Sequence, residues 1–172
     1  ILYNISNLME LYQGLELREP NEKEFREWFK ISTLQQAKDR TYVNVSNLDD
    51  ELLIIEQQIS HLLHNGKDTA NHYFRVLCLD KKENIGFIWF GHIPNLGDLD
   101  IMLMDIIINH DFRRQGYGRM MLLQMHQVMK KKGYQRIILY VLHKNPARYL
   151  YSSLGYKTIK ENDKSSLMMI SL

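Results

Sequence analysis

One short segment carries the residue types needed to hold a pyrophosphate: Arg113-Arg114-Gln115-Gly116-Tyr117-Gly118. It lies between a predicted buried strand and a predicted helix, so its backbone amides can point together at the positive end of a helix dipole. Glycine lets a ligand approach the backbone closely, and Arg113, Arg114 and Arg119 add positive charge. The same letters also fit a tight turn whose arginines face solvent. The segment alone leaves both interpretations open.

Two familiar nucleotide-binding loops do not fit this segment. It lacks the Gly-Lys-Ser/Thr ending of a P-loop, and Met121 stands where a dinucleotide-binding loop would have its third glycine. A nucleotide bound here would be held in another way.

The elements that position the segment follow from hydrophobic periodicity and from turn residues. Helices are expected over 22–40, 48–64 and 146–154, and from the loop to Gly133; strands are expected over 15–18, 73–79, 85–93, 99–108, 136–142, 156–159 and 167–171. Short polar connectors make the strands from 73 to 108 antiparallel neighbours, while the helix before 136–142 makes that strand parallel to 99–108. The strand 99–108 is apolar on both faces and should be central. The sequence thus predicts an α/β chain with a mixed sheet, antiparallel early and parallel late.

Length and composition narrow the class of protein. A chain of 172 residues without repeats or a Pro-, Gly- or Ser-rich linker fits one domain, and 45% hydrophobic with 24% charged residues is typical of a globular protein. The net charge of +2 favours neither nucleic acid nor an anionic membrane surface. No apolar run approaches the roughly 20 residues of a membrane span, so a cytoplasmic protein is expected.

Three sequence blocks in order resemble the GNAT superfamily of acyl-CoA-dependent N-acyltransferases. The loop at 113–118 fits that family's Arg/Gln-Xaa-Xaa-Gly-Xaa-Gly/Ala signature, and residues 105–112 look like the strand and acidic turn before it. Residues 145–156 look like the family's later block, in which Leu-Tyr is followed by Gly-Phe or Gly-Tyr. The resemblance covers roughly residues 15 to 172.

The resemblance implies a GNAT domain over 15–172 after an N-terminal extension, 1–14. It implies a fold with splayed fourth and fifth strands and helices on both sheet faces. Acetyl-CoA would be the cosubstrate, with no metal, and a primary amine of a small molecule or of a peptide or protein would be the acceptor; a homodimer is common in such proteins. The backbone of Ile106, Ile107 and Ile108 would pair with the pantetheine arm, and the amides from Arg114 to Arg119 would hold the pyrophosphate. A non-catalytic acyl-CoA-binding module is the alternative.

The resemblance also suggests catalytic residues. Tyr151 matches the tyrosine placed near the CoA sulfur, where a phenol can protonate the departing thiolate. Many relatives carry a glutamate on the fourth strand where this chain has methionines, and Asp105 is the nearest carboxylate. Strict alternation points Asp105 to the face opposite Ile106 unless a bulge intervenes. It could act as the base, bind a cationic substrate or make a structural hydrogen bond.

Other candidates are open at this point. A water relay to Asp100 or His72 could replace Asp105 as the base. His143, at the end of a predicted strand, could face the cleft or bond to backbone. Relatives often have an asparagine where this chain has Lys144, which leaves Asn145, one place later, as the candidate for the CoA contact.

Overall fold

The computed structural model describes residues 14–80 and 83–172, so the predicted N-terminal extension lies outside the described residues apart from Gly14. The described chain divides into two compact units: residues 20–72, called here the helical unit, and residues 14–19 with 73–172, called the sheet unit. A single domain over 15–172 stays a prediction. Within the described ranges, no helix is both long and apolar enough to cross a membrane.

The helical unit contains helices α2 (Glu22–Asn44) and α3 (Leu48–Leu62) and a short 3-10 turn, η1 (Gly66–Asp68). A capping box begins α2: the Asn21 side chain accepts from the Glu24 amide, and the Glu24 carboxylate accepts from the Asn21 amide. Asn47 caps α3 by a single hydrogen bond, which its side chain accepts from the amide of Asp49. These polar caps begin the two helices where the sequence suggested, and α2 runs on to Asn44, beyond its expected end near Arg40.

A buried carboxylate joins the two helices. Glu51 of α3 accepts hydrogen bonds from Ser46 (2.6 Å) and Asn44 (3.0 Å), and Arg40 of α2 lies 2.8 Å from its other oxygen. The Ser46 and Asn44 hydrogen bonds, followed by the charge of Arg40, lower the pKa of Glu51. The connection between α2 and α3 is therefore held by a charged network as well as by apolar contacts.

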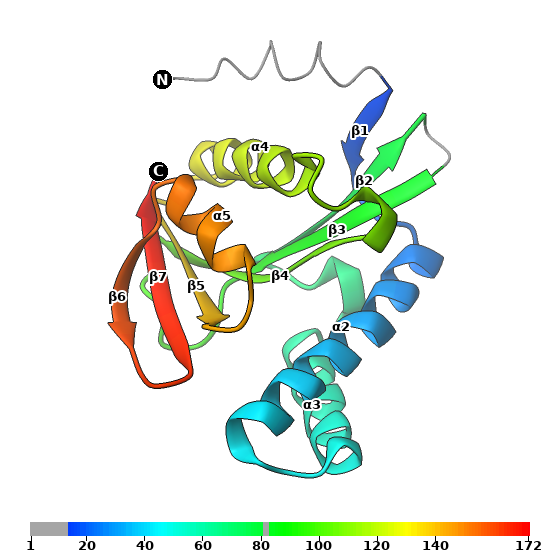
Figure 1. The fold of residues 1–172 in the computed structure, drawn as a ribbon. Helices are drawn as coiled ribbons and strands as arrows, with labels where there is room; N and C mark the ends of the chain where they lie inside the picture. Colours follow the sequence, from blue (N-terminus) through cyan, green and yellow to red (C-terminus); the bar gives the residue numbers. More distant parts are fainter. Residues whose placement is uncertain (1–13, 81–82) are drawn as a thin grey trace. The chain divides into compact units, whose positions relative to one another are not determined.

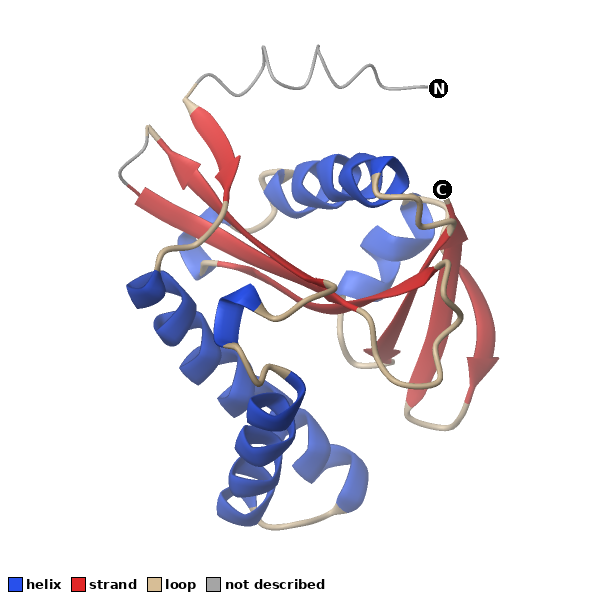
Figure 2. Ribbon diagram, turned by 180° about the vertical axis from the view of Figure 1, so that it is seen from behind, coloured by secondary structure: helices blue, strands red, loops and turns tan. Residues whose placement is uncertain are grey.

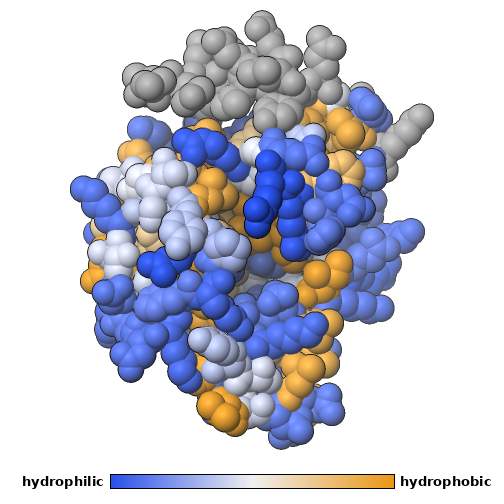
Figure 3. All heavy atoms as spheres, in the orientation of Figure 1, coloured by the Kyte–Doolittle hydropathy of each residue, from blue (hydrophilic) through white to orange (hydrophobic). Residues whose placement is uncertain are grey.

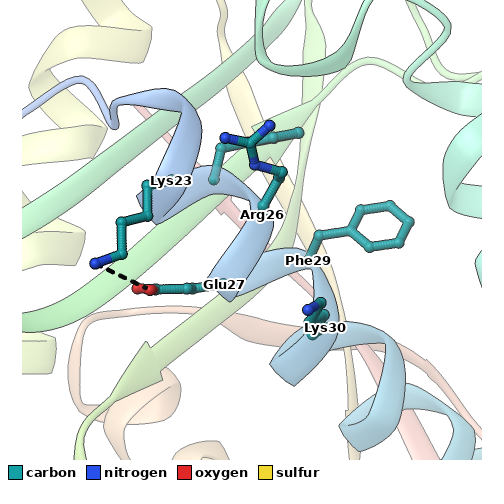
Figure 4. A pocket seen from close by; sticks show the side chains of 6 residues that line it. Lys23, Arg26, Glu27, Phe29 and Lys30 are labelled. Atoms are coloured by element: carbon teal, nitrogen blue, oxygen red, sulfur yellow. Dashed lines mark ion pairs between the residues drawn. The ribbon is translucent and has the colours of Figure 1, made fainter.

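The surface of the helical unit includes a pocket of about 440 Å³ beside the first turns of α2. It is lined by Lys23, Phe25, Arg26, Glu27, Phe29 and Lys30, with Lys23 and Glu27 3.9 Å apart (Figure 4). Large apolar side chains are also exposed on α2 and α3, including Ile31 and Leu53, and Figure 3 shows such residues mixed with hydrophilic ones.

The sheet unit holds seven strands in the order β1-β2-β3-β4-β5-β7-β6 (Figures 1 and 2). Their bounds are β1 Leu15–Arg18, β2 His72–Leu79, β3 Glu83–Gly91, β4 Asp100–Ile108, β5 Arg136–Leu142, β6 Lys157–Glu161 and β7 Ser165–Ser171. β4 and β5 are parallel, whereas β3 with β4, β5 with β7 and β7 with β6 are antiparallel. The predicted mixed sheet is confirmed, and its parallel part is a single strand pair.

Helices α4 (Tyr117–Lys131) and α5 (Ala147–Ser153) pack on one face of this sheet (Figure 1). Apolar residues at helical spacing give α4 a fully buried stripe that includes Met121, Leu122, Met125 and Met129. This stripe meets inward-facing residues of the central strands, such as Ile101 and Ile137. The core therefore fixes the helix that follows the glycine loop against the strand that precedes it.

The parallel pair β4–β5 is short and then opens. Pairing joins Asp100, Ile101 and Met102 with residues 136–138, although both strands continue beyond it. At the closed end, Arg136 donates to both oxygens of the buried Asp100 carboxylate, with Nε at 2.5 Å and Nη2 at 2.8 Å. A bidentate ion pair thus fastens the point from which the strands diverge.

Candidate active site

The glycine loop forms a helix N-terminus without a side-chain cap. Arg114 and Gly116 adopt positive φ, 61° and 89°, and α4 begins at Tyr117. The Met120 amide makes the first bond of the helix, to the Gly116 carbonyl, so the amides of the turn before it have no acceptor within the helix. Amides in this arrangement, at the positive end of a helix, are suited to a phosphate.

Side chains of the loop mostly bond to the protein itself. Arg113 Nε donates to the Ile108 carbonyl at 2.8 Å, and Gln115 Nε2 donates to the Asp111 carbonyl at 3.0 Å. Arg119 Nη1 donates to Ser153 Oγ on α5 at 2.9 Å. These contacts shape the turn and leave the backbone amides, with the exposed Arg114, as the groups best placed for an anion.

Gly118 has a second role that its sequence motif did not indicate. A Cβ at this position would lie 3.5 Å from Leu150 Cδ2 and 3.7 Å from Ile108 Cγ1. The glycine therefore lets α4 pack close to both α5 and the end of β4, in addition to exposing the backbone to a ligand. A single methyl group would meet only ordinary contacts here, so the packing alone would tolerate alanine.

The C-terminal half of β4 exposes one edge. The Asn109 amide donates to Ile85 on β3. Because peptide groups alternate along an antiparallel ladder, Ile107 also turns its amide and carbonyl to β3, while Ile106 and Ile108 turn theirs to the β5 side. The Ile108 carbonyl there accepts from Arg113. Of the three predicted backbone contacts, the geometry favours Ile106 and the Ile108 amide over Ile107.

A bulge in β4 decides where Asp105 points. Trp89 pairs with Asp105 and Phe90 with Leu103, which leaves Met104 as the extra residue. Leu103 belongs to the core before the bulge, and Ile106 packs against the core after it. Asp105, adjacent to Ile106, therefore lies on the opposite face. The bulge exists, but it comes before Asp105 and does not turn the carboxylate to the Ile106 side.

Tyr151 lies on α5 and is 6% exposed, and the described residues provide its hydroxyl with no hydrogen-bond partner. Burial raises the pKa of the Tyr151 phenol, and the negative charge of Asp105 raises it further. The phenol is thus protonated at neutral pH and free to donate.

The remaining sequence candidates have structural partners. The Asn145 side chain accepts from the Ala147 amide at 2.9 Å and so caps α5, while its proposed contact with CoA stays a prediction. His143 Nε2 lies 3.0 Å from Ser166 Oγ, a side-chain partner rather than the backbone one considered from sequence. Asp100 is held by Arg136 at the far end of β4. At a strand rise of about 3.3 Å per residue, Asp100 lies about 16 Å from Asp105, which is too far for a relay through one water.

Two contacts of α4, one with α5 and one with the residue Tyr156 that follows it, were not anticipated from the sequence. One is the Arg119–Ser153 bond, and the other joins His126 Nε2 to Tyr156 Oη at 2.8 Å. The second contact could have been suspected from the sequence, because His126 lies four residues after Leu122 and three before Met129, on the apolar stripe of the helix. Burial lowers the pKa of His126 to about 4.

The sheet unit thus combines an uncapped helix N-terminus, an open strand edge and a buried phenol, features that suit the phosphates, the amide-bearing arm and the thioester of an acyl-CoA. The family model described as Acetyltransferase (GNAT) family matches residues 9–156. The chain belongs to this family and is an acyltransferase.

Several proteins with similar sequences or folds are named as acetyltransferases. N-acetyltransferase YycN of Bacillus subtilis is 25% identical over 136 residues, 78% of this chain and 87% of that protein. Its crystal structure gives a TM-score of 0.77 at 23% identity, over 86% of this chain and 95% of that one. The structure of PaiA N-acetyltransferase from Thermoplasma acidophilum in complex with coenzyme A gives a TM-score of 0.68 at 18% identity, over 92% of this chain and 99% of that one. The structure of spermidine N-acetyltransferase from Vibrio cholerae with CoA and spermine gives a TM-score of 0.67 at 17% identity, over 92% of this chain and 95% of that one.

Proposed function

We propose that this protein transfers the acetyl group of acetyl-CoA to a primary amine of a small molecule, peptide or protein. The observation that carries the proposal is the buried Tyr151 phenol, which is protonated and has no hydrogen-bond partner among the described residues. It lies on α5, and a hydrogen bond between Arg119 and Ser153 joins α5 to the helix that begins at the phosphate-binding loop. The loop amides would hold the pyrophosphate, and the Ile106 and Ile108 backbone would pair with the pantetheine arm. The thioester would then lie in the opening between β4 and β5.

The proposed reaction forms a C–N bond as the C–S bond breaks. The neutral amine attacks the thioester carbonyl, the thiolate leaves, and the Tyr151 hydroxyl gives it a proton. The proton lost by the amine restores the phenol through the bulk solvent or an intervening base. General acid catalysis of this kind typically contributes about 10²- to 10⁴-fold in rate.

Asp105 is proposed to bind the ammonium group of the acceptor substrate and to take its proton. Asp105 lies on the strand face opposite Ile106, but its negative charge acts on Tyr151, and a carboxylate within that range favours a cationic acceptor. Polyamines are one acceptor class to examine, since the structurally similar Vibrio cholerae protein is a spermidine N-acetyltransferase. Asp105→Asn should lower kcat/KM for a cationic acceptor if Asp105 binds its ammonium group and takes its proton.

The test measures release of free thiol from acetyl-CoA with a panel of spermidine, an amino sugar, a peptide with a free N-terminus and a lysine peptide. We expect turnover with at least one acceptor and a loss of kcat of about 100-fold or more in Tyr151→Phe. Tyr149→Phe is the matched control, because Tyr149 lies on the same helix and is 73% exposed. CoA binding without thiol release would indicate a binding module instead, and wild-type kcat in Tyr151→Phe would refute the assignment of the acid.

A further inference from the structure

We propose that Tyr156 and His126 are positioning residues that hold the Tyr151 ring in place through a hydrogen bond to α4. The inference rests on the proposed role of Tyr151. His126 Nε2 and Tyr156 Oη are 2.8 Å apart, and the Tyr156 ring packs against Tyr151 with centroids 5.6 Å apart and planes tilted by 59°. Tyr156 is 3% exposed, so the contact is in the core.

Local backbone geometry brings the two tyrosines together. Gly155 has φ of 96°, a left-handed conformation that ends α5 and reverses the chain. The Tyr156 amide then donates to the Tyr151 carbonyl at 3.1 Å. Within the described residues the Tyr151 hydroxyl has no hydrogen bond to locate it, so the position of its ring depends on packing, and Tyr156 is its aromatic neighbour.

The hydrogen bond has a defined direction. His126 is neutral at physiological pH because burial lowers its pKa to about 4, so one ring nitrogen is an acceptor. Burial, and then the charge of Tyr151, raise the pKa of the Tyr156 phenol, which therefore stays protonated. Tyr156 donates and His126 Nε2 accepts.

The bond connects both parts of the proposed cofactor site. His126 lies on the helix that begins at the glycine loop, and Tyr156 follows the helix that carries Tyr151. Arg119 and Ser153 join the same two helices nearer the loop. Two hydrogen bonds thus set the spacing between the phosphate-binding amides and the proposed acid, and errors of about 1 Å in such spacing can cost about 100-fold in rate.

The first experiment removes only the hydroxyl of Tyr156, with the best acceptor of the panel. We expect Tyr156→Phe to lower kcat about tenfold while KM for acetyl-CoA stays within twofold of wild type. His126→Gln keeps an acceptor for the Tyr156 hydroxyl and should retain most of kcat. Tyr134→Phe is the matched control, because it removes a phenol from another pair, Tyr73 and Tyr134, whose oxygens are 3.2 Å apart.

A double-mutant cycle separates positioning from general destabilisation. If Tyr156 acts through Tyr151, Tyr156→Phe should have no further effect on kcat in a Tyr151→Phe background. An additive loss would overturn the proposal, as would wild-type kcat in Tyr156→Phe when Tyr151→Phe is strongly impaired. Wild-type kcat in Tyr151→Phe would instead refute the proposed acid itself, so the two failures are distinguishable.

Discussion

Replacing His126 with Gln should change how the stability of the protein depends on pH. His126 is neutral in the folded state, since burial lowers its pKa to about 4, whereas its ordinary value is 6.5. Between these values the unfolded chain binds a proton that the folded chain does not, so stability falls as pH falls from 6.5 to 4. Gln keeps a hydrogen-bond acceptor for Tyr156 but does not titrate.

The size of the effect follows from the pKa difference. A shift from 6.5 to about 4 is about 2.5 units, which at 1.36 kcal/mol per unit corresponds to about 3 kcal/mol once the full window is crossed. At pH 5 the loss relative to pH 8 is about 2 kcal/mol. Carboxylates titrate in both proteins and cancel in the difference.

The assay is urea unfolding of wild type and His126→Gln at pH 8 and pH 5, followed by tryptophan fluorescence and far-UV circular dichroism. The stability of wild type relative to the variant should be about 2 kcal/mol lower at pH 5 than at pH 8. Nuclear magnetic resonance titration of the His126 ring gives the pKa independently. A difference that does not vary with pH, or a His126 pKa near 6.5 in the folded protein, would show that the ring is not buried as described.

Three further predictions concern the glycines and one ion pair. Gly118→Val should weaken acetyl-CoA binding in calorimetry, and equal affinity would contradict the loop assignment. Gly118→Ala should lose little stability, whereas Gly116→Ala should lose about 1–2 kcal/mol because Gly116 has φ of 89°. Gly86→Ala should cost about 1–3 kcal/mol in urea unfolding, since its Cβ would lie 2.9 Å from the Ile107 carbonyl oxygen and 2.7 Å from Ile108 Cδ1, and unchanged stability would refute this close approach. Arg136→Met should lower the melting temperature by leaving the buried Asp100 carboxylate without its cation, and a wild-type melting temperature would show that the pair does not hold the β4–β5 junction.

Much of the sheet unit could be predicted from sequence because its periodicity is strong. The strand at Arg136–Leu142 has the bounds expected, and β4 begins one residue later than expected. Gly116 and Gly133 mark the turns at both ends of α4, and both adopt positive φ. The glycine loop, its helix and the strand before it were all inferred from local pattern.

The orientation of side chains at the site could not be predicted in the same way. The Met104 bulge depends on how β3 pairs with β4, which local sequence does not encode, and it fixes the face of Asp105. The bond between His126 and Tyr156 joins residues 30 positions apart and requires α4 and α5 to lie on one face of the sheet. The order β5-β7-β6 likewise arises from pairing at long range.

The most direct test of the central claim is a crystal structure of the protein with acetyl-CoA. We predict the pyrophosphate on the amides at the start of α4, the pantetheine arm beside Ile106 and Ile108, and the sulfur within about 3.5 Å of Tyr151 Oη. Acetyl-CoA bound away from the opening between β4 and β5, or a sulfur out of reach of Tyr151, would contradict it.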